Sequence, residues 1–276
     1  MLSPRARIAI VAAAGLFTLF TTLHAQKPFR EYPAIEYSDF PLPADYEEPS
    51  EFVFARLMYP PAPTARFDRS RGRWYEGNSS WTQDYPRADR HFLEAIRRLT
   101  RLNARSVEQA INLDDEDDVF NYPLLYAVRP GEWELTGAQA AKFHEYLSRG
   151  GFFMTDDFWG TFEWDVFMRS MSKVWPDSEP ADIDNPDSIF HIVFDLNDRY
   201  RVPGAWGLYG TGYQYDGSVP YWKAVRDDKK RIIAAITPNS DLGDSWEHAD
   251  NPEYPEKYSA LGIRMGVNFI VYSMTH

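Results

Sequence analysis

The segment from Gly150 to Gly160 constrains the fold more than any other part of the chain. Two glycines end a helical pattern, a short apolar run follows from Phe152, and two carboxylates precede an aromatic and glycine turn. This order is typical of a buried strand in an α/β sheet. Ligands of open α/β sheets bind at the carboxyl ends of the strands, so Asp156 and Asp157 are predicted to lie at a binding or active site.

Helical and strand patterns alternate around this segment. The clearest helix begins at Thr136, which forms a capping-box pattern with Gln139, and it ends at Gly150. Further helices are predicted at 89–102 and 163–174, and strands at 51–58, 106–111, 123–128 and 152–154. Together these patterns predict one three-layer α/β/α domain with a mostly parallel sheet over residues 51–276.

The second half of the chain is less regular. Short strands are predicted at 189–196, 206–209, 221–226 and 231–237, with a hairpin tip between the last two. Residues 256–274 alternate as a strand would, but the length of the run favours a buried helix. In such a helix Gly262 and Gly266 lie one turn apart and permit close packing.

The first 50 residues indicate export. Arg5 and Arg7 precede an apolar stretch from Ile8 to Leu23, and Ala25 stands at the expected cleavage point, which is the layout of a cleaved signal peptide at residues 1–25. Because the stretch is just shorter than the roughly 17–25 residues that cross a bilayer, cleavage is favoured over an N-terminal anchor, which stays the alternative. Residues 26–50 are Pro-rich and form a spacer or wrap the surface. We therefore expect a periplasmic or secreted protein with no membrane span after signal cleavage.

Charge and cysteine content exclude several classes of function. The net charge of −12 repels phosphate backbones, so nucleic acid is not an expected partner. The sequence contains no cysteine, which removes thiol nucleophiles and thiolate zinc sites. No His-pair metal motif or Gly-rich phosphate loop is present, and we assign no metal site and no cofactor.

Two clusters of acidic and aromatic residues are the candidate site. One follows the strand at 152–154, and the other spans 239–250 after the strand at 231–237. The candidate catalytic residues are Asp156, Asp157, Asp244 and His248, and the candidate ligand-binding residues are Trp81, Asp84, Tyr85, Trp159, Asp241 and Trp246. These side chains suit acid–base work on a sugar, sugar binding by stacking, or a hard cation. Equally, the acids could cap turns and the tryptophans fill the core.

Several of these motifs resemble the bacterial family called domain of unknown function 4159. The resemblance is carried by Trp81 with Asp84-Tyr85-Pro86, by Asn121-Tyr122-Pro123, by 147–160, by Asp241-Leu242-Gly243-Asp244 with Trp246, and by Pro252-Glu253-Tyr254-Pro255. It runs from about residue 51 to 276. It implies a flavodoxin-like domain similar to class I glutamine amidotransferases, and it implies no activity. Those enzymes place a catalytic cysteine on the turn that corresponds to 156–160, and this chain has none.

Fold and composition together favour a ligand-binding domain of the cell envelope. A saccharide or another envelope component is the expected ligand. One alternative is an envelope hydrolase with an Asp/His acid–base pair, and another is a scaffold that binds envelope proteins.

Overall fold

A computed structural model describes residues 27–37, 40–176 and 179–276. The expected signal peptide lies outside these residues. Within the described part of the chain, one sheet of 7 strands has the order β2-β1-β3-β4-β7-β6-β5. The strands are β1 (Ala55–Met58), β2 (Gln109–Asn112), β3 (Leu124–Val128), β4 (Phe152–Asp156), β5 (Ala181–Asp182), β6 (Lys223–Arg226) and β7 (Ile232–Ile236).

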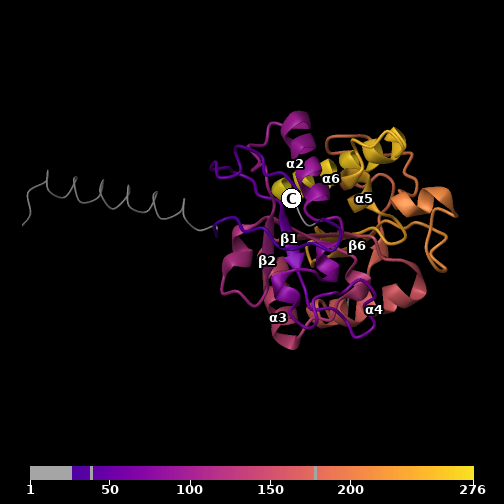
Figure 1. The fold of residues 1–276 in the computed structure, drawn as a ribbon. Coiled ribbons are helices and arrows are strands. Elements are labelled where there is room, and N and C mark those ends of the chain that lie inside the picture. The colour runs from indigo at the N-terminus through magenta and orange to yellow at the C-terminus, as the bar shows by residue number, and fades with distance from the viewer. Residues whose placement is uncertain (1–26, 38–39, 177–178) are drawn as a thin grey trace, which may run out of the picture.

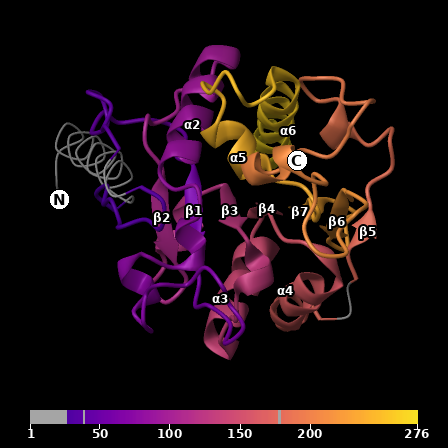
Figure 2. The same cartoon turned by 45° about the vertical axis from the view of Figure 1, so that its right-hand side comes forward.

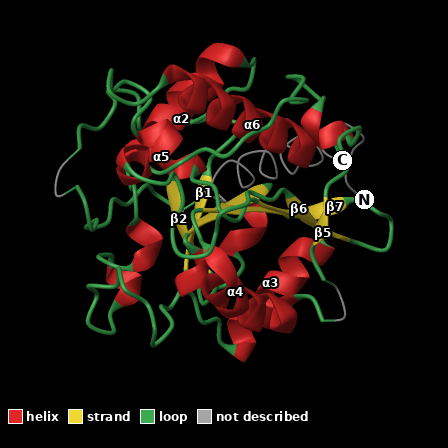
Figure 3. Ribbon diagram, turned by 90° about the vertical axis from the view of Figure 1, so that its right-hand side faces the viewer, coloured by secondary structure: helices red, strands yellow, loops and turns green. Residues whose placement is uncertain are grey.

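Helices cover both faces of this sheet, as Figures 1 and 2 show. The α-helices are α2 (Arg87–Leu99), α3 (Gly137–Ser148), α4 (Gly160–Val174), α5 (Leu242–Glu247) and α6 (Glu256–Thr275). Seen in Figure 3, α2, α5 and α6 lie on one side of the strands and α3 and α4 on the other. The predicted three-layer α/β/α architecture is confirmed.

The central strands are parallel and buried, as the apolar runs predict. Strands β2, β1, β3, β4 and β7 are parallel neighbours, and every residue of β1, β3, β4 and β7 is buried. Helices on both faces account for this burial. The order 2-1-3-4 followed by β7 is that of a doubly wound sheet, whose crevice lies at the carboxyl ends of the strands. Strands β6 and β5 extend the sheet as an antiparallel edge.

Two local predictions are confirmed in detail. Thr136 and Gln139 form the capping box at the start of α3, each side chain bonding the other's backbone N–H. In α6 a Cβ on Gly262 would lie 1.9 Å from Ser245 Oγ, and one on Gly266 would lie 2.4 Å from a ring atom of Phe92. These glycines therefore let α6 pack directly on α5 and α2.

Two predicted strands are wrong. Residues 189–196 instead contain the 3₁₀ helix η5 (Ser188–Phe190), because the Asp187 carboxylate accepts the N–H of Ile189 and begins a turn. Residues 206–209 lie in the 3₁₀ helix η6 (Ala205–Tyr209), where glycines precede and follow the short aromatic run. The other 3₁₀ helices are η1 (Trp74–Glu76), η2 (Ser80–Thr82), η3 (Asp118–Asn121) and η4 (Pro130–Glu132).

The Pro-rich N-terminal segment packs on the domain. Lys27 pairs with Asp115 at 2.7 Å, and Glu31 pairs with the buried Arg90 of α2. Ala34 is buried. Among the described residues, no helix combines the length and apolar character that a bilayer span requires.

Candidate functional site

A cavity of about 600 Å³ opens at the carboxyl ends of the strands. Its walls come from five parts of the chain: the N-terminal segment, the loop before α2, the ends of β3 and β4, the 204–214 loop, and the region of α5. Its polar lining is Glu36, Gln83, Asp84, Arg129, Asp157, Asp241, Asp244, Glu247 and His248, and its aromatic lining is Tyr37, Phe67, Trp159, Trp206 and Tyr213. The two acidic clusters of the sequence thus meet in one cavity.

A buried arginine fixes the loop that presents Asp84. Arg56 of β1 donates to both carboxylate oxygens of Asp89 at 2.6 Å, and neither side chain is exposed. The same guanidinium donates to the backbone carbonyls of Trp81 at 3.0 Å and Gln83 at 3.1 Å. Asp84 follows directly, and its backbone N–H donates to Glu36 at 2.9 Å. The position of Asp84 therefore depends on β1 and on the N-terminal segment.

The two acids after β4 have different surroundings. Asp156 lies behind the cavity wall, where it accepts hydrogen bonds from the Tyr126 hydroxyl and the Gly243 N–H, both at 2.8 Å. Burial, with the charge of Asp157, raises the pKa of Asp156 to about 7. Asp157 faces the cavity and accepts from Arg129 at 2.8 Å and from the indole N–H of Trp159 at 2.7 Å. Asp156 thus links β4 to the start of α5, while Asp157 lines the cavity beside Arg129.

The N-terminal end of α5 carries two more cavity acids. Asp241 caps the helix, with Oδ1 accepting the N–H of Asp244 at 2.8 Å. Asp244 accepts the N–H of Ala205 at 2.5 Å, which ties α5 to the 204–214 loop. Burial first, and then neighbouring carboxylates, raise the pKa values of Asp84, Asp241 and Asp244. Desolvation and repulsion together make it costly for all three to be ionised.

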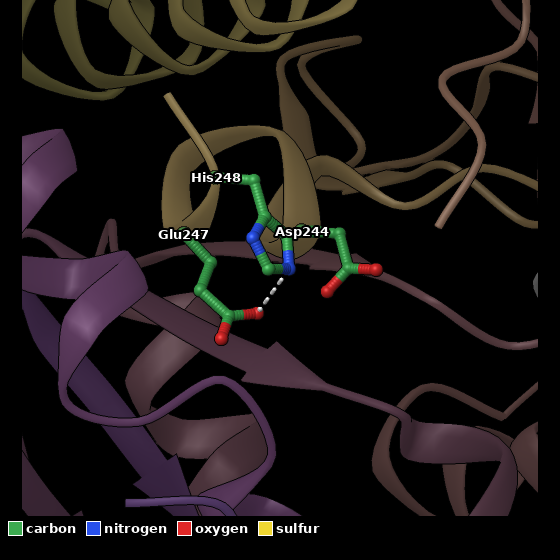
Figure 4. A group of neighbouring side chains, drawn as sticks. All are labelled: Asp244, Glu247 and His248. Atoms are coloured by element: carbon green, nitrogen blue, oxygen red, sulfur yellow. Dashed lines mark ion pairs between the residues drawn. The ribbon is translucent and has the colours of Figure 1, made fainter. Parts of the chain in front are cut away.

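Glu247 and His248 line this end of the cavity, and Figure 4 shows them together with Asp244. The Nε2 atom of His248 lies 3.4 Å from Glu247 Oε2, and the hydroxyl of Tyr37 donates to Glu247 Oε1. Burial first, and then the charge of Glu36, raise the pKa of Glu247. The side chains able to hold a metal ion form three overlapping groups: Asp244 with Glu247 and His248, Glu36 with Asp84 and Glu247, and Asp84 with Asp241 and Asp244.

Left-handed backbone conformations gather around the cavity. Asp84, Arg129 and Asp157 line it with φ values of +60°, +50° and +48°, and nearby Asn239 has +60°. Asp and Asn adopt this conformation more readily than other non-glycine residues, whereas for Arg129 it costs roughly 1–2 kcal/mol. The surrounding structure therefore holds Arg129 in a conformation that an arginine otherwise avoids.

The structure divides the predicted site residues into two groups. Asp84, Asp157, Trp159, Asp241, Asp244 and His248 line the cavity. Trp81, Tyr85 and Trp246 belong to the core and are fully buried, and Asp156 is buried behind the wall. Trp246 stacks on Phe92 with ring centroids 4.2 Å apart. The indoles and the phenol are thus placed for packing, away from any ligand in the cavity.

Sequence reasoning missed Glu36, Tyr37, Phe67, Arg129, Trp206 and Glu247. Arg129 could have been found, because it directly follows the predicted strand at 123–128 and therefore lies at a strand's carboxyl end. It pairs with Asp157, and its Nη2 lies 3.8 Å from both Glu132 and Glu163. Glu36 lies in a Pro-rich segment without periodicity, which gives no comparable signal.

Fold and site define a doubly wound α/β domain with an acid-lined cavity at its strand ends. The chain belongs to the family described as Domain of unknown function (DUF4159), whose model matches residues 70–274. This confirms the family that the sequence motifs resemble. No curated protein matches the chain.

Proposed function

We propose that the protein is a ligand-binding domain of the cell envelope whose cavity takes a saccharide or a related polyhydroxylated component. One observation carries the proposal: carboxylates and aromatic faces share a single cavity of about 600 Å³. This volume lies within the roughly 300–1,000 Å³ of typical small-ligand sites. Trp206 lines the cavity with 92% of its surface exposed.

The chemistry of the walls matches that of a sugar. Sugar hydroxyls donate hydrogen bonds, which carboxylates such as Asp157 and Asp241 can accept. The C–H faces of the sugar ring stack on indole or phenol rings. Arg129 adds a fixed cation for an acidic substituent. An indole as exposed as Trp206 costs hydration free energy until a partner covers it. A polyhydroxylated ring can contact the carboxylates, the aromatic rings and the guanidinium at the same time.

Sequence features support an envelope setting. The signal-like pattern at 1–25 favours export, and the net charge of −12 disfavours polyanions such as nucleic acids. Exposed aromatic residues on the 204–214 loop could also contact an envelope protein, which keeps such partners within the proposal.

The second candidate is an envelope hydrolase with an Asp/His acid–base set. Two carboxyl groups in the cavity favour this candidate. Burial raises the pKa of Asp244, and Asp157 accepts a hydrogen bond from Arg129 in the same cavity. Sugar hydrolysis requires one protonated acid and one carboxylate. Amidotransferase chemistry through cysteine is excluded, because the sequence has no cysteine.

Calorimetric titration with N-acetylglucosamine oligomers and soluble peptidoglycan fragments tests the proposal. Binding should weaken roughly tenfold or more, equivalent to about 1.4 kcal/mol, in Trp206→Ala, whose melting temperature should not change. Tyr75→Ala, which removes an aromatic 47% exposed outside the cavity, should bind as the wild type does. Release of reducing sugar ends would favour the hydrolase. Absence of binding to both sugar classes, or equal binding by Trp206→Ala, would contradict the saccharide proposal.

A further inference from the structure

Three carboxylates from two separate segments converge at the acidic end of the cavity. Asp84 comes from the loop before α2, and Asp241 and Asp244 come from the first turn of α5. Each offers one oxygen, and these oxygens lie within 4.8 Å of one another. Glu36 and Glu247 form a second group with Asp84 at the same spacing. Both groups contain Asp84, so four further acids lie near this one carboxyl group.

The orientation of Asp84 indicates what this volume receives. Asp84 is 1% exposed, and its Oδ2 atom is buried without a hydrogen-bond partner. A buried carboxylate oxygen without a partner is unfavourable unless something coordinates it. Oδ2 lies over the start of α5, where a Cβ on Gly243 would be 2.3 Å away. Because Gly243 lies between Asp241 and Asp244, this oxygen faces the turn that carries both acids.

A second glycine keeps space beside the other two acids. A Cβ on Gly204 would lie 2.7 Å from Asp241 Oδ2 and 3.0 Å from Asp244 Oδ2. Among the residues that the structure describes, no Lys, Arg or His nitrogen forms an ion pair with Asp84, Asp241 or Asp244. Nearby Arg129 is paired with Asp157 instead. Within the described part of the chain, the three acids thus have no protein cation in direct contact.

We propose that Asp84, Asp241 and Asp244 form a binding site for a hard divalent cation, with Ca²⁺ as its occupant. Hard cations take carboxylate oxygens, whereas a softer transition metal would prefer imidazole or thiolate. Ca²⁺ accepts 6–8 oxygens in flexible geometry, so the cavity can supply water or ligand oxygens at the remaining positions. Mg²⁺ requires near-ideal octahedral geometry, so we expect this cluster of carboxylates to bind Mg²⁺ more weakly than Ca²⁺.

This cation site goes beyond the saccharide proposal and does not depend on it. The metal alone is the probe, so failure of sugar binding would leave the cation site unaffected, and the reverse also holds. Where both are correct, the cation's open positions face the cavity, and sugar hydroxyls could complete its coordination.

The test titrates CaCl₂ into EDTA-treated, dialysed full-length protein by calorimetry and follows the melting temperature. At a Ca²⁺ concentration of about 100 times Kd, the melting temperature should rise by about 5 °C or more. Asp84→Asn should weaken Ca²⁺ binding roughly tenfold or more and should raise the melting temperature in EDTA, because it removes a repelling charge. Asp117→Asn is the matched control, because it deletes an equal charge from an exposed side chain that pairs with Lys142. This variant should bind Ca²⁺ as the wild type does.

Asp244→Asn provides a second variant should Asp84→Asn fail to fold. Unchanged Ca²⁺ affinity in either folded variant, or no Ca²⁺ binding by the wild type, would overturn the proposal. Preferential Zn²⁺ binding that is lost in His248→Ala would also overturn it, since it would assign the group of Asp244, Glu247 and His248 to a transition metal.

Discussion

Replacing Glu163 by Gln should stabilise the protein in a pH-dependent way. Glu163 lies in the first turn of α4 and is 3% exposed. Its Oε2 accepts the N–H of Trp159 at 2.7 Å, and its Oε1 lies 3.8 Å from Arg129. Burial raises the pKa of Glu163 to about 7, despite the opposing attraction of Arg129. Gln keeps the acceptor and the shape of the side chain, and it carries no charge at any pH.

The magnitude follows from linkage between proton binding and folding. The folded protein binds the Glu163 proton more tightly than the unfolded chain does, because the pKa is about 7 in the fold and 4.5 ordinarily. Stability from this group is therefore lost as pH rises from about 4.5 through about 7. At 1.36 kcal/mol for each pKa unit, the penalty is roughly 3 kcal/mol at pH 8 and roughly 1 kcal/mol at pH 5.5.

Urea unfolding of both proteins at pH 5.5 and pH 8 measures this difference. Buried acids far from Glu163 titrate equally in both proteins and cancel in the comparison, whereas Asp157 and Glu132 interact with Glu163 and contribute to the measured difference. Glu163→Gln should be the more stable protein by about 3 kcal/mol at pH 8, with a smaller gain at pH 5.5. A variant less stable than the wild type at pH 8 would show that attraction to Arg129 exceeds the cost of burial, and it would refute the reasoning.

Three further predictions concern buried charge and processing. Asp89→Asn should lower the free energy of unfolding by about 3–5 kcal/mol, because Arg56 stays buried without its bidentate partner; a loss below about 1 kcal/mol in urea unfolding would contradict this. Asp157→Asn should lower the melting temperature, since Arg129 loses its nearest carboxylate, and an unchanged melting temperature would mean that Glu132 and Glu163 compensate fully. Mass spectrometry of the native protein should find Gln26 at the mature N-terminus, whereas a retained Met1 would support an anchor.

Local signals predicted most of the fold. The capping box at Thr136 and the apolar run at Phe152 are encoded within a few residues, and both appear in the structure as expected. The apolar runs around Ile189 and Trp206 predict strands, but they form 3₁₀ helices, because a short apolar run does not distinguish a strand from a helical turn. Their conformation is set by local capping and by glycines, and by contacts with distant residues.

The site was predictable where it follows strand ends. Asp157 and Asp241 were found because acids after buried strands gather at one edge of a parallel sheet. Trp246 also follows a strand, but it stacks on Phe92 in the core, and no sequence pattern states which way an indole turns. Glu36 was missed because its contact with Asp84 spans 48 residues and depends on an irregular segment.

The N-terminal segment gives the cavity a wall that can diverge separately from the rest. The family match begins at residue 70, whereas Glu36, Tyr37 and Phe67 lie before it and line the same cavity as the matched Asp84 and Asp241. Loops outside the secondary-structure framework accept substitution and insertion more readily than buried strands do. Changes in this wall can therefore retune ligand preference while leaving the sheet and the α5 acids in place. Exchanging residues 27–50 between relatives would change the wall formed by Glu36 and Tyr37 while leaving β1 and the rest of the sheet in place.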